Sequence, residues 1–296
     1  MNQPKTLFWL SLLIALLAAV YAGVGLFSQG GDGPFYFTTV RGETVEMYGW
    51  GVYRFDTAFR APIFRGTDAV TLFLCVPALI AAALFARRGT LRGRLFLASV
   101  LAYFLYNPAS LAFGAAYNSL LLVYIASVPA SLFAFVLAFR SIDLPTLAAH
   151  SSAKLPHRWI AVFLFVAGLS LMIWIVDIVG ALVEGTVPAT LGPYHTEATY
   201  TLDLGIILPT AFLAGILVWR RNPLGTLLAC ITITLELTVG LVVAGQTVMQ
   251  VLDGILLSSG EYAVYVMPFV LMSLIASGLL TSIFRNLSEP TTPRHR

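Results

Sequence analysis

The sequence predicts an all-α integral membrane protein, a polytopic transmembrane helical bundle of eight spans. Apolar runs close to 20 residues long recur along the 296 residues, and this is the helix length that crosses the hydrocarbon core of a bilayer. Only 10% of the residues are charged, whereas a soluble domain has roughly 25%. The lysines and arginines also collect in alternate loops. These observations favour a membrane protein, and the small net charge of +3 favours an explanation by membrane topology over nucleic-acid binding.

The first predicted span is an uncleaved anchor. Val20-Tyr21-Ala22 resembles a signal-peptide cleavage site, but the apolar run continues past it to Phe27. In the third span, Asn107-Pro108 predicts a kink or a broken helix. The eight predicted spans cover residues 7–27, 68–86, 95–115, 119–139, 159–183, 203–219, 224–248 and 263–284.

The loop of residues 28–67 is the long polar stretch of the chain. Its first part, FYFTTVRGETVEMY, alternates loosely in polarity and predicts a small β-hairpin. Its second part, GWGVYRFDTAFRAPIFRG, mixes aromatic residues with arginines and predicts an interfacial helix. Two interpretations remain open: a lid over the helix mouths that binds a ligand or partner, or an aromatic loop that rests on the membrane surface.

The basic residues predict the orientation of the chain. With eight spans both termini lie on one side of the membrane, and 13 of the 17 lysines and arginines fall on that side. The other four, Arg41, Arg54, Arg60 and Arg65, all lie in the loop 28–67. Cytoplasmic loops carry the excess of basic residues, so we expect both termini in the cytoplasm and the loop 28–67 outside.

The two halves of the chain resemble each other, which predicts a 4+4 parallel internal repeat. Spans 2 and 6 each begin near an aspartate, contain a proline and end in Arg-Arg, at 87–88 and 220–221. The predicted domains are residues 1–140, a cytoplasmic linker at 141–158 with two prolines, and residues 159–296. The alternative is that apolar helices ending in arginine look alike without a common origin. If the repeat is real, a binding site is expected between the halves.

Four carboxylates are the candidate ligand- or cation-binding residues: Asp68, Asp177, Asp203 and Glu236. A charge inside the bilayer costs roughly 2.5–3.5 kcal/mol on insertion scales, so it usually has a partner or a purpose. Asp68 and Asp203 have a second interpretation as helix N-caps, because each lies where its span was predicted to start. Glu236 lies deepest, with threonines nearby that could hold it as a purely structural group.

The sequence contains no HExxH, GxSxG, P-loop or dinucleotide-binding pattern, which argues against an enzyme. The four histidines are scattered and predict no metal centre, and nothing indicates a cofactor. Cys75 and Cys230 both fall inside apolar runs and are expected in the core.

Three segments carry a resemblance to uncharacterised multi-pass membrane proteins of bacteria: RGTDAVTLFLCVP, RRGTLRGRLFLASVLAYFLYNPASLAFGAAYN and LDLGIILP. The resemblance covers most of the chain and implies a bacterial inner membrane, but it implies no activity. The predicted partners are the lipid bilayer and a small solute or cation, bound in the outer half between the repeats. The alternatives are a sensor or assembly protein that binds a partner through the loop 28–67, and an intramembrane enzyme.

Overall fold

The computed structural model describes residues 3–188 and 191–290, and eight of its helices or helix pairs are long and apolar enough to cross a membrane. The predicted number of spans and the all-α class are therefore confirmed, and the protein is a multi-pass membrane protein by length and composition of its helices. Spans 1 to 8 cover Pro4–Phe27, Arg60–Arg87, Leu91–Gly114, Leu121–Arg140, His157–Glu184, Ala198–Trp219, Pro223–Leu252 and Ser259–Arg285.

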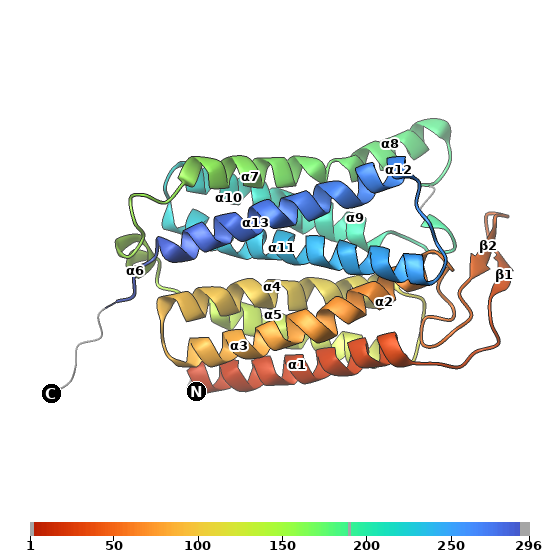
Figure 1. Ribbon diagram of the computed structural model, residues 1–296, viewed down its shortest axis with the longest axis horizontal. Coiled ribbons are helices and arrows are strands. Elements are labelled where there is room, and N and C mark those ends of the chain that lie inside the picture. The colour runs from red at the N-terminus through yellow and green to blue at the C-terminus, as the bar shows by residue number, and fades with distance from the viewer. Residues whose placement is uncertain (1–2, 189–190, 291–296) are drawn as a thin grey trace.

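The helices run side by side along the long axis of the molecule (Figure 1). Helix α1 (Gln3–Phe27) begins and helix α13 (Met267–Arg285) ends at one end of the bundle, here called the terminal face. The hairpin of strands β1 (Phe35–Thr38) and β2 (Thr44–Met47) lies at the opposite end, here called the loop face. The helices are α1 (Gln3–Phe27), α2 (Arg60–Val70), α3 (Val76–Arg87), α4 (Leu91–Gly114), α5 (Leu121–Arg140), α6 (Leu144–Ala149), α7 (His157–Ser170), α8 (Ile173–Glu184), α9 (Ala198–Leu202), α10 (Leu208–Trp219), α11 (Pro223–Leu252), α12 (Ser259–Glu261) and α13 (Met267–Arg285).

The first four spans pack into a closed ring: α1 contacts α2, α3 and α5, and α4 contacts α3 and α5. In the second half, α10 packs between α7 and α11, and α11 packs against α13. Helix α11 also packs on α2 and α4, so it joins the two halves. A side chain at Gly66 would overlap the backbone of Gln246, so glycine allows α2 and α11 to approach closely.

The predicted hairpin is confirmed. Strand β1 (Phe35–Thr38) pairs antiparallel with β2 (Thr44–Met47), and Gly42 turns the chain with a φ of +85°. The predicted interfacial helix is wrong, because residues 49–59 form turns and the helix that starts at Arg60 is already span 2. Gly49 and Gly51 have positive φ, a conformation that interrupts a helix.

Three spans contain a π-helical turn followed by a proline: Thr71–Cys75, Asp203–Ile207 and Tyr262–Val266. In each, the proline is the second residue after the turn, at 77, 209 and 268. A π turn is a common adjustment where a proline removes a helical hydrogen bond. The predicted interruption at Asn107-Pro108 is different, because α4 continues through it while packed against α3, α5 and α11.

One break was not predicted: span 5 divides at Leu171–Met172 into α7 and α8. No proline or glycine marks the division, and the amides of Met172 and Trp174 bond carbonyls three residues back instead of four. The predicted linker 141–158 contains α6 and is tied to the chain's end, since the amide of Ser288 donates to the carbonyl of His150.

Candidate functional site

Asp203 is the centre of a polar cluster that joins the two halves on the loop-face side of the bundle. Its Oδ1 accepts a hydrogen bond of 2.8 Å from the hydroxyl of Tyr106 on α4, and its Oδ2 accepts one of 3.0 Å from the indole N–H of Trp174 on α8. Because Asp203 opens the π turn that leads into α10, its carboxylate is held at a point where the helix is already irregular.

Asp177 lies beside this cluster. It accepts a short hydrogen bond from the hydroxyl of Tyr200, and the ring of Tyr200 stacks on the ring of Trp174 with centroids 5.0 Å apart. Trp174 and Tyr200 therefore connect the two carboxylates through one aromatic pair. The faces of such rings attract cations.

Glu236 lies near the middle of α11 and close enough to Asp203 and Tyr106 to interact with both electrostatically. Three of the four candidate carboxylates, Asp177, Asp203 and Glu236, are thus brought together by spans 5, 6 and 7. Among the described residues, none of the three forms an ion pair with lysine or arginine within 4.0 Å. In the same part of the chain, no three histidine, cysteine or carboxylate side chains lie close enough together to hold a metal ion.

Asp68 does not belong to this cluster. It is fully buried in the first half, where its Oδ2 accepts a hydrogen bond of 2.7 Å from the hydroxyl of Tyr53. The interpretation as helix N-caps is wrong for both Asp68 and Asp203. Asp68 is the ninth residue of α2, whose N-cap is Phe59, and Asp203 follows α9, whose N-cap is Glu197. Both helices start earlier than predicted, so their aspartates lie inside the spans.

A groove of about 540 Å³ lies beside the cluster. Residues of α8, of the loop before α9 and of α9 line it, and this loop contributes both apolar and polar side chains. Tyr200, Leu204 and Gly205, which adjoin Asp177 or Asp203, line it. The groove therefore lies next to the carboxylate cluster.

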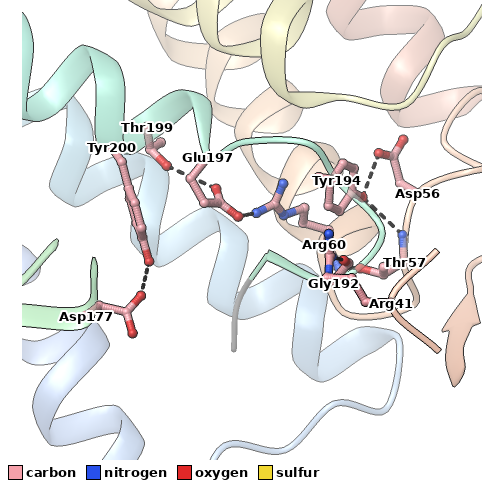
Figure 2. A network of polar contacts seen from close by, with 10 residues as sticks. All are labelled: Arg41, Asp56, Thr57, Arg60, Asp177, Gly192, Tyr194, Glu197, Thr199 and Tyr200. Atoms are coloured by element: carbon pink, nitrogen blue, oxygen red, sulfur yellow. Dashed lines mark hydrogen bonds and ion pairs between the residues drawn. The ribbon is translucent and has the colours of Figure 1, made fainter. Parts of the chain in front are cut away.

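The sequence did not predict a network of polar contacts that connects the loop 28–67 to the loop before span 6 (Figure 2). We call it the loop-face clasp; it consists of Arg41, Asp56, Thr57, Arg60, Gly192, Tyr194 and Glu197. Arg60 forms an ion pair with Glu197, and its guanidinium lies over the ring of Tyr194, 4.0 Å from the centroid. Since Glu197 also lines the groove, the clasp forms part of the groove's wall at the loop face.

Asp56 is the buried hydrogen-bond acceptor of the clasp. Its Oδ1 accepts hydrogen bonds from the amide of Ala116, at 2.8 Å, and from the hydroxyl of Tyr194, at 2.9 Å. Its side chain is fully buried and Oδ2 has no hydrogen-bond partner among the described residues. Burial raises the pKa of Asp56 to about 6, against the opposing effect of its hydrogen bonds and of Arg60.

Only a weak pattern in the sequence indicates the clasp. The sequence predicts Arg60 at the membrane surface, whereas in the structure it is the first residue of α2 and its side chain is 14% exposed. Comparison with known proteins adds nothing to this picture: no protein-family model, curated protein or solved structure matches the chain.

Proposed function

We propose that the protein binds and passes a small, positively charged solute at a loop-side site between the two halves, with Asp203 as the central binding group. The observation that carries the proposal is the carboxylate of Asp203 held by Tyr106 of the first half and Trp174 of the second, with Glu236 beside it. Acidic groups inside a membrane protein that lack a basic partner commonly mark the path of an ion or a cationic substrate.

Two further features support the proposal. The π turn and Pro209 interrupt the helix at Asp203, and interrupted helices at membrane depth are tolerated where they line a cavity or are buried in protein. Helix α8 has few neighbours on this side, and its apolar residues Val176, Leu182 and Val183 are exposed. A helix held mainly by Trp174 and Asp177 is suited to move when a solute enters.

The proposal also covers the orientation of the protein in the membrane and the common origin of its two halves. The excess of basic residues on the terminal face favours a cytoplasmic position for that face, in a bacterial inner membrane. The proposed common origin of the halves 1–140 and 159–296, joined by the linker 141–158, is supported by the π turn and proline in the second span of each half. Span 8 has the same turn, whereas its counterpart, span 4, does not. The proposed site then lies between the repeats, where such proteins commonly bind substrate.

Binding is tested by thermal unfolding of the purified protein in NaCl, KCl or tetraethylammonium chloride. A cation at about 100 times its Kd stabilises the folded state by about 2.7 kcal/mol, so one of these salts should raise Tm. Asp203→Asn should lose the rise. The matched control is Asp143→Asn, an exposed helix cap on the terminal face that Asn fills as well as Asp. An equal rise in wild type and Asp203→Asn would contradict the proposal.

A second candidate function is recognition of a partner through the hairpin. All four residues of β1 are exposed, Tyr36 is 74% exposed and Val40 at the turn is 95% exposed. Exposed aromatic residues on a two-stranded sheet suit contact with another protein. Replacing Tyr36 and Val40 with serine should then abolish the protein's biological effect in cells while leaving cation-dependent stabilisation unchanged. If both properties survive, the hairpin is not a recognition element.

A further inference from the structure

We infer that the first four spans enclose a hydrated path that brings protons from the loop face to Asp68 and on towards the middle of the membrane. This path lies outside the cluster at Asp203, and the inference does not depend on the proposed function. It rests on which helix faces are polar, on buried polar atoms without partners, and on a cavity at the loop face.

Three of the four spans in the ring bury polar residues at helical spacing. On α4, Ser99, Tyr103 and Asn107 follow one another every four residues and all are buried. On span 2 the buried series is Asp68, Thr71 and Cys75, and on α5 it is Tyr124, Ser127 and Ser131. Residues three or four apart share one face of a helix. Three apolar spans that each bury a polar face are unusual for a bundle held only by apolar packing.

Contacts across the ring show that these faces meet. The amide of Asn107 donates to the hydroxyl of Tyr21 on α1 at 3.1 Å and also reaches the hydroxyl of Thr71 at 3.5 Å. Thr71 in turn forms a short hydrogen bond with Tyr103. Since α1 and α4 lie on opposite sides of the ring, Asn107 and Tyr21 point into its interior. The result is a chain of hydroxyl and amide groups linking three spans.

Several buried polar atoms in this interior lack a hydrogen-bond partner among the described residues: Oδ1 of Asp68, Oγ of Ser99 and Oγ of Ser131. A buried polar group without a partner is destabilising, and such groups commonly bind internal water. Three orphaned oxygens along one interior, interleaved with the bonded groups, are what a file of water molecules would satisfy.

The path has an entrance at the loop face. A cavity of about 340 Å³ is lined there by Gln29, Trp50 and Arg65, and at its inner end by Gly25 and Tyr53. Both inner residues touch Asp68: Tyr53 donates to its carboxylate, and a side chain at Gly25 would overlap Oδ2. Glycine at position 25 therefore lets the carboxyl group lie directly beside the cavity's inner wall.

Towards the terminal face the same helix faces become apolar. Leu95 lies one turn before Ser99, Leu79 one turn after Cys75, and Ala134 and Ala138 follow Ser131; all are buried. Ser99 lies eight residues from the start of α4, about 12 Å along the helix. The polar interior thus ends inside the bundle, which makes the path a half-channel open to the loop face alone.

Asp68 is the group in this path that can carry a proton. The titratable and charged groups around it are Tyr21 from α1, Tyr53 from the loop, Arg65 from its own helix, Tyr103 from α4 and Tyr124 from α5. Arg65 is paired with Asp253 at 2.8 Å, and α11 contributes the neutral Gln246, which bonds Thr67. Apart from Arg65 the charged or titratable neighbours named above are tyrosines, and none of them carries a second carboxyl group.

The native cysteines give a matched test of hydration. Cys75 lies on the path, whereas Cys230 is also buried but lies in α11 away from it. In nanodiscs, Cys230→Ala and Cys75→Ala each leave one thiol, which is treated with Ag⁺ and then counted by maleimide labelling after denaturation. We expect Cys75 to react at least about 100-fold faster than Cys230, since thiols react as hydrated thiolates. Equal, slow reaction of both would overturn the inference.

A second pair of variants extends the test along α4. In a protein without native cysteines, Ser99→Cys should react with Ag⁺ and Ala98→Cys, one residue off the polar face, should not. Proton access is tested by infrared difference spectra between acidic and alkaline buffer, where a titrating carboxyl band should be missing from Asp68→Asn. Spectra that Asp68→Asn leaves unchanged would overturn the role of Asp68.

Discussion

Asp68 and Asp203 show how much the surroundings of one carboxyl group decide its role. Each lies near the loop-face end of a span that continues into a π turn and a proline. Measured from the prolines, however, the residue that corresponds to Asp203 is Thr71, not Asp68. Asp203 therefore faces Tyr106 and Trp174 at the junction of the halves, while Asp68 is enclosed by the first half with Tyr53.

Gly25 is the residue that makes room for Asp68. A methyl group there would overlap the carboxylate and approach the hydroxyl of Tyr53, so Gly25→Ala should lower Tm and separate the two groups. Gly23 is the matched control on the same helix, because its added methyl group would meet nothing within 4 Å. We expect Gly23→Ala to leave thermal unfolding of the purified protein unchanged or slightly stabilised. Equal destabilisation by both would refute the close contact.

Asp56 should make stability depend on pH. Its folded pKa of about 6 lies above the unfolded value, so the folded state holds the proton more tightly. That contribution is present below the unfolded pKa and is lost as pH rises from about 4 to about 6. Asn can keep both hydrogen bonds of Oδ1, and its N–H₂ group replaces the unpartnered Oδ2. We expect the Tm difference between Asp56→Asn and wild type to grow in favour of the variant across this window. A constant difference would contradict the assignment.

At the scale of elements, the sequence predicted which segments are helices and misplaced where several begin. Span 2 starts at Arg60 and not at residue 68. The sequence did not predict this start, because the aromatic residues and arginines at 49–66 resemble a surface segment as much as a helix start. Apolar periodicity identified α7 and α8 as one span, since no proline or glycine marks their division. These boundaries decide the site: they place Asp68 inside a helix and bring Trp174 to Asp203.

The candidate site could be predicted from the sequence only in part. Carboxylates in apolar spans are visible in a sequence, so Asp177, Asp203 and Glu236 could be selected. Their aromatic partners could not, because tyrosine and tryptophan in a span usually indicate only the membrane interface. The separation of Asp68 from the others depends on which helices pack together, and that information is spread over the whole chain.

The loop-face clasp makes a prediction about two connecting loops. Arg60 and Glu197 are 14% and 8% exposed, and removing one partner of a buried pair costs about 3–5 kcal/mol because the other charge stays buried. Glu197→Gln should lower Tm and speed protease cleavage of the loop before span 6. Glu46→Gln, at an exposed position of β2, is the control and should change neither. If the two variants behave alike, the ion pair does not fasten the loops.

At the scale of the whole molecule, the two halves have different packing: a closed ring in spans 1–4 and a row of α7, α10, α11 and α13 in spans 5–8. Span 3 is 67% buried and span 8 is 17% buried, so the outer surface of the second half is the more exposed to lipid. The ring encloses the proposed polar path, and the groove lies beside α8 and α9 in the second half. The proposed common origin therefore concerns the spans and not their final packing.

The distribution of basic residues predicts the orientation in the membrane, because α1 begins and α13 ends at the same face of the bundle. In a protein whose native cysteines are replaced by alanine, Val40→Cys at the hairpin turn should react with a membrane-impermeant maleimide added to intact cells. Ala153→Cys, an exposed position in the linker, should react only after the cells are opened. The reverse pattern would place the termini outside and contradict the distribution of the basic residues.

The central claim is that the charge of Asp203 binds the solute, and charge movement in proteoliposomes tests it most directly. Currents are recorded on a solid-supported membrane after jumps in Na⁺, K⁺ or tetraethylammonium. Asp203→Glu keeps the charge and should retain a current with an altered apparent affinity. Asp203→Asn removes the charge and should reduce the current at least about 10-fold, as expected when about 1.4 kcal/mol or more of binding is lost. A wild-type current in Asp203→Asn would contradict the account.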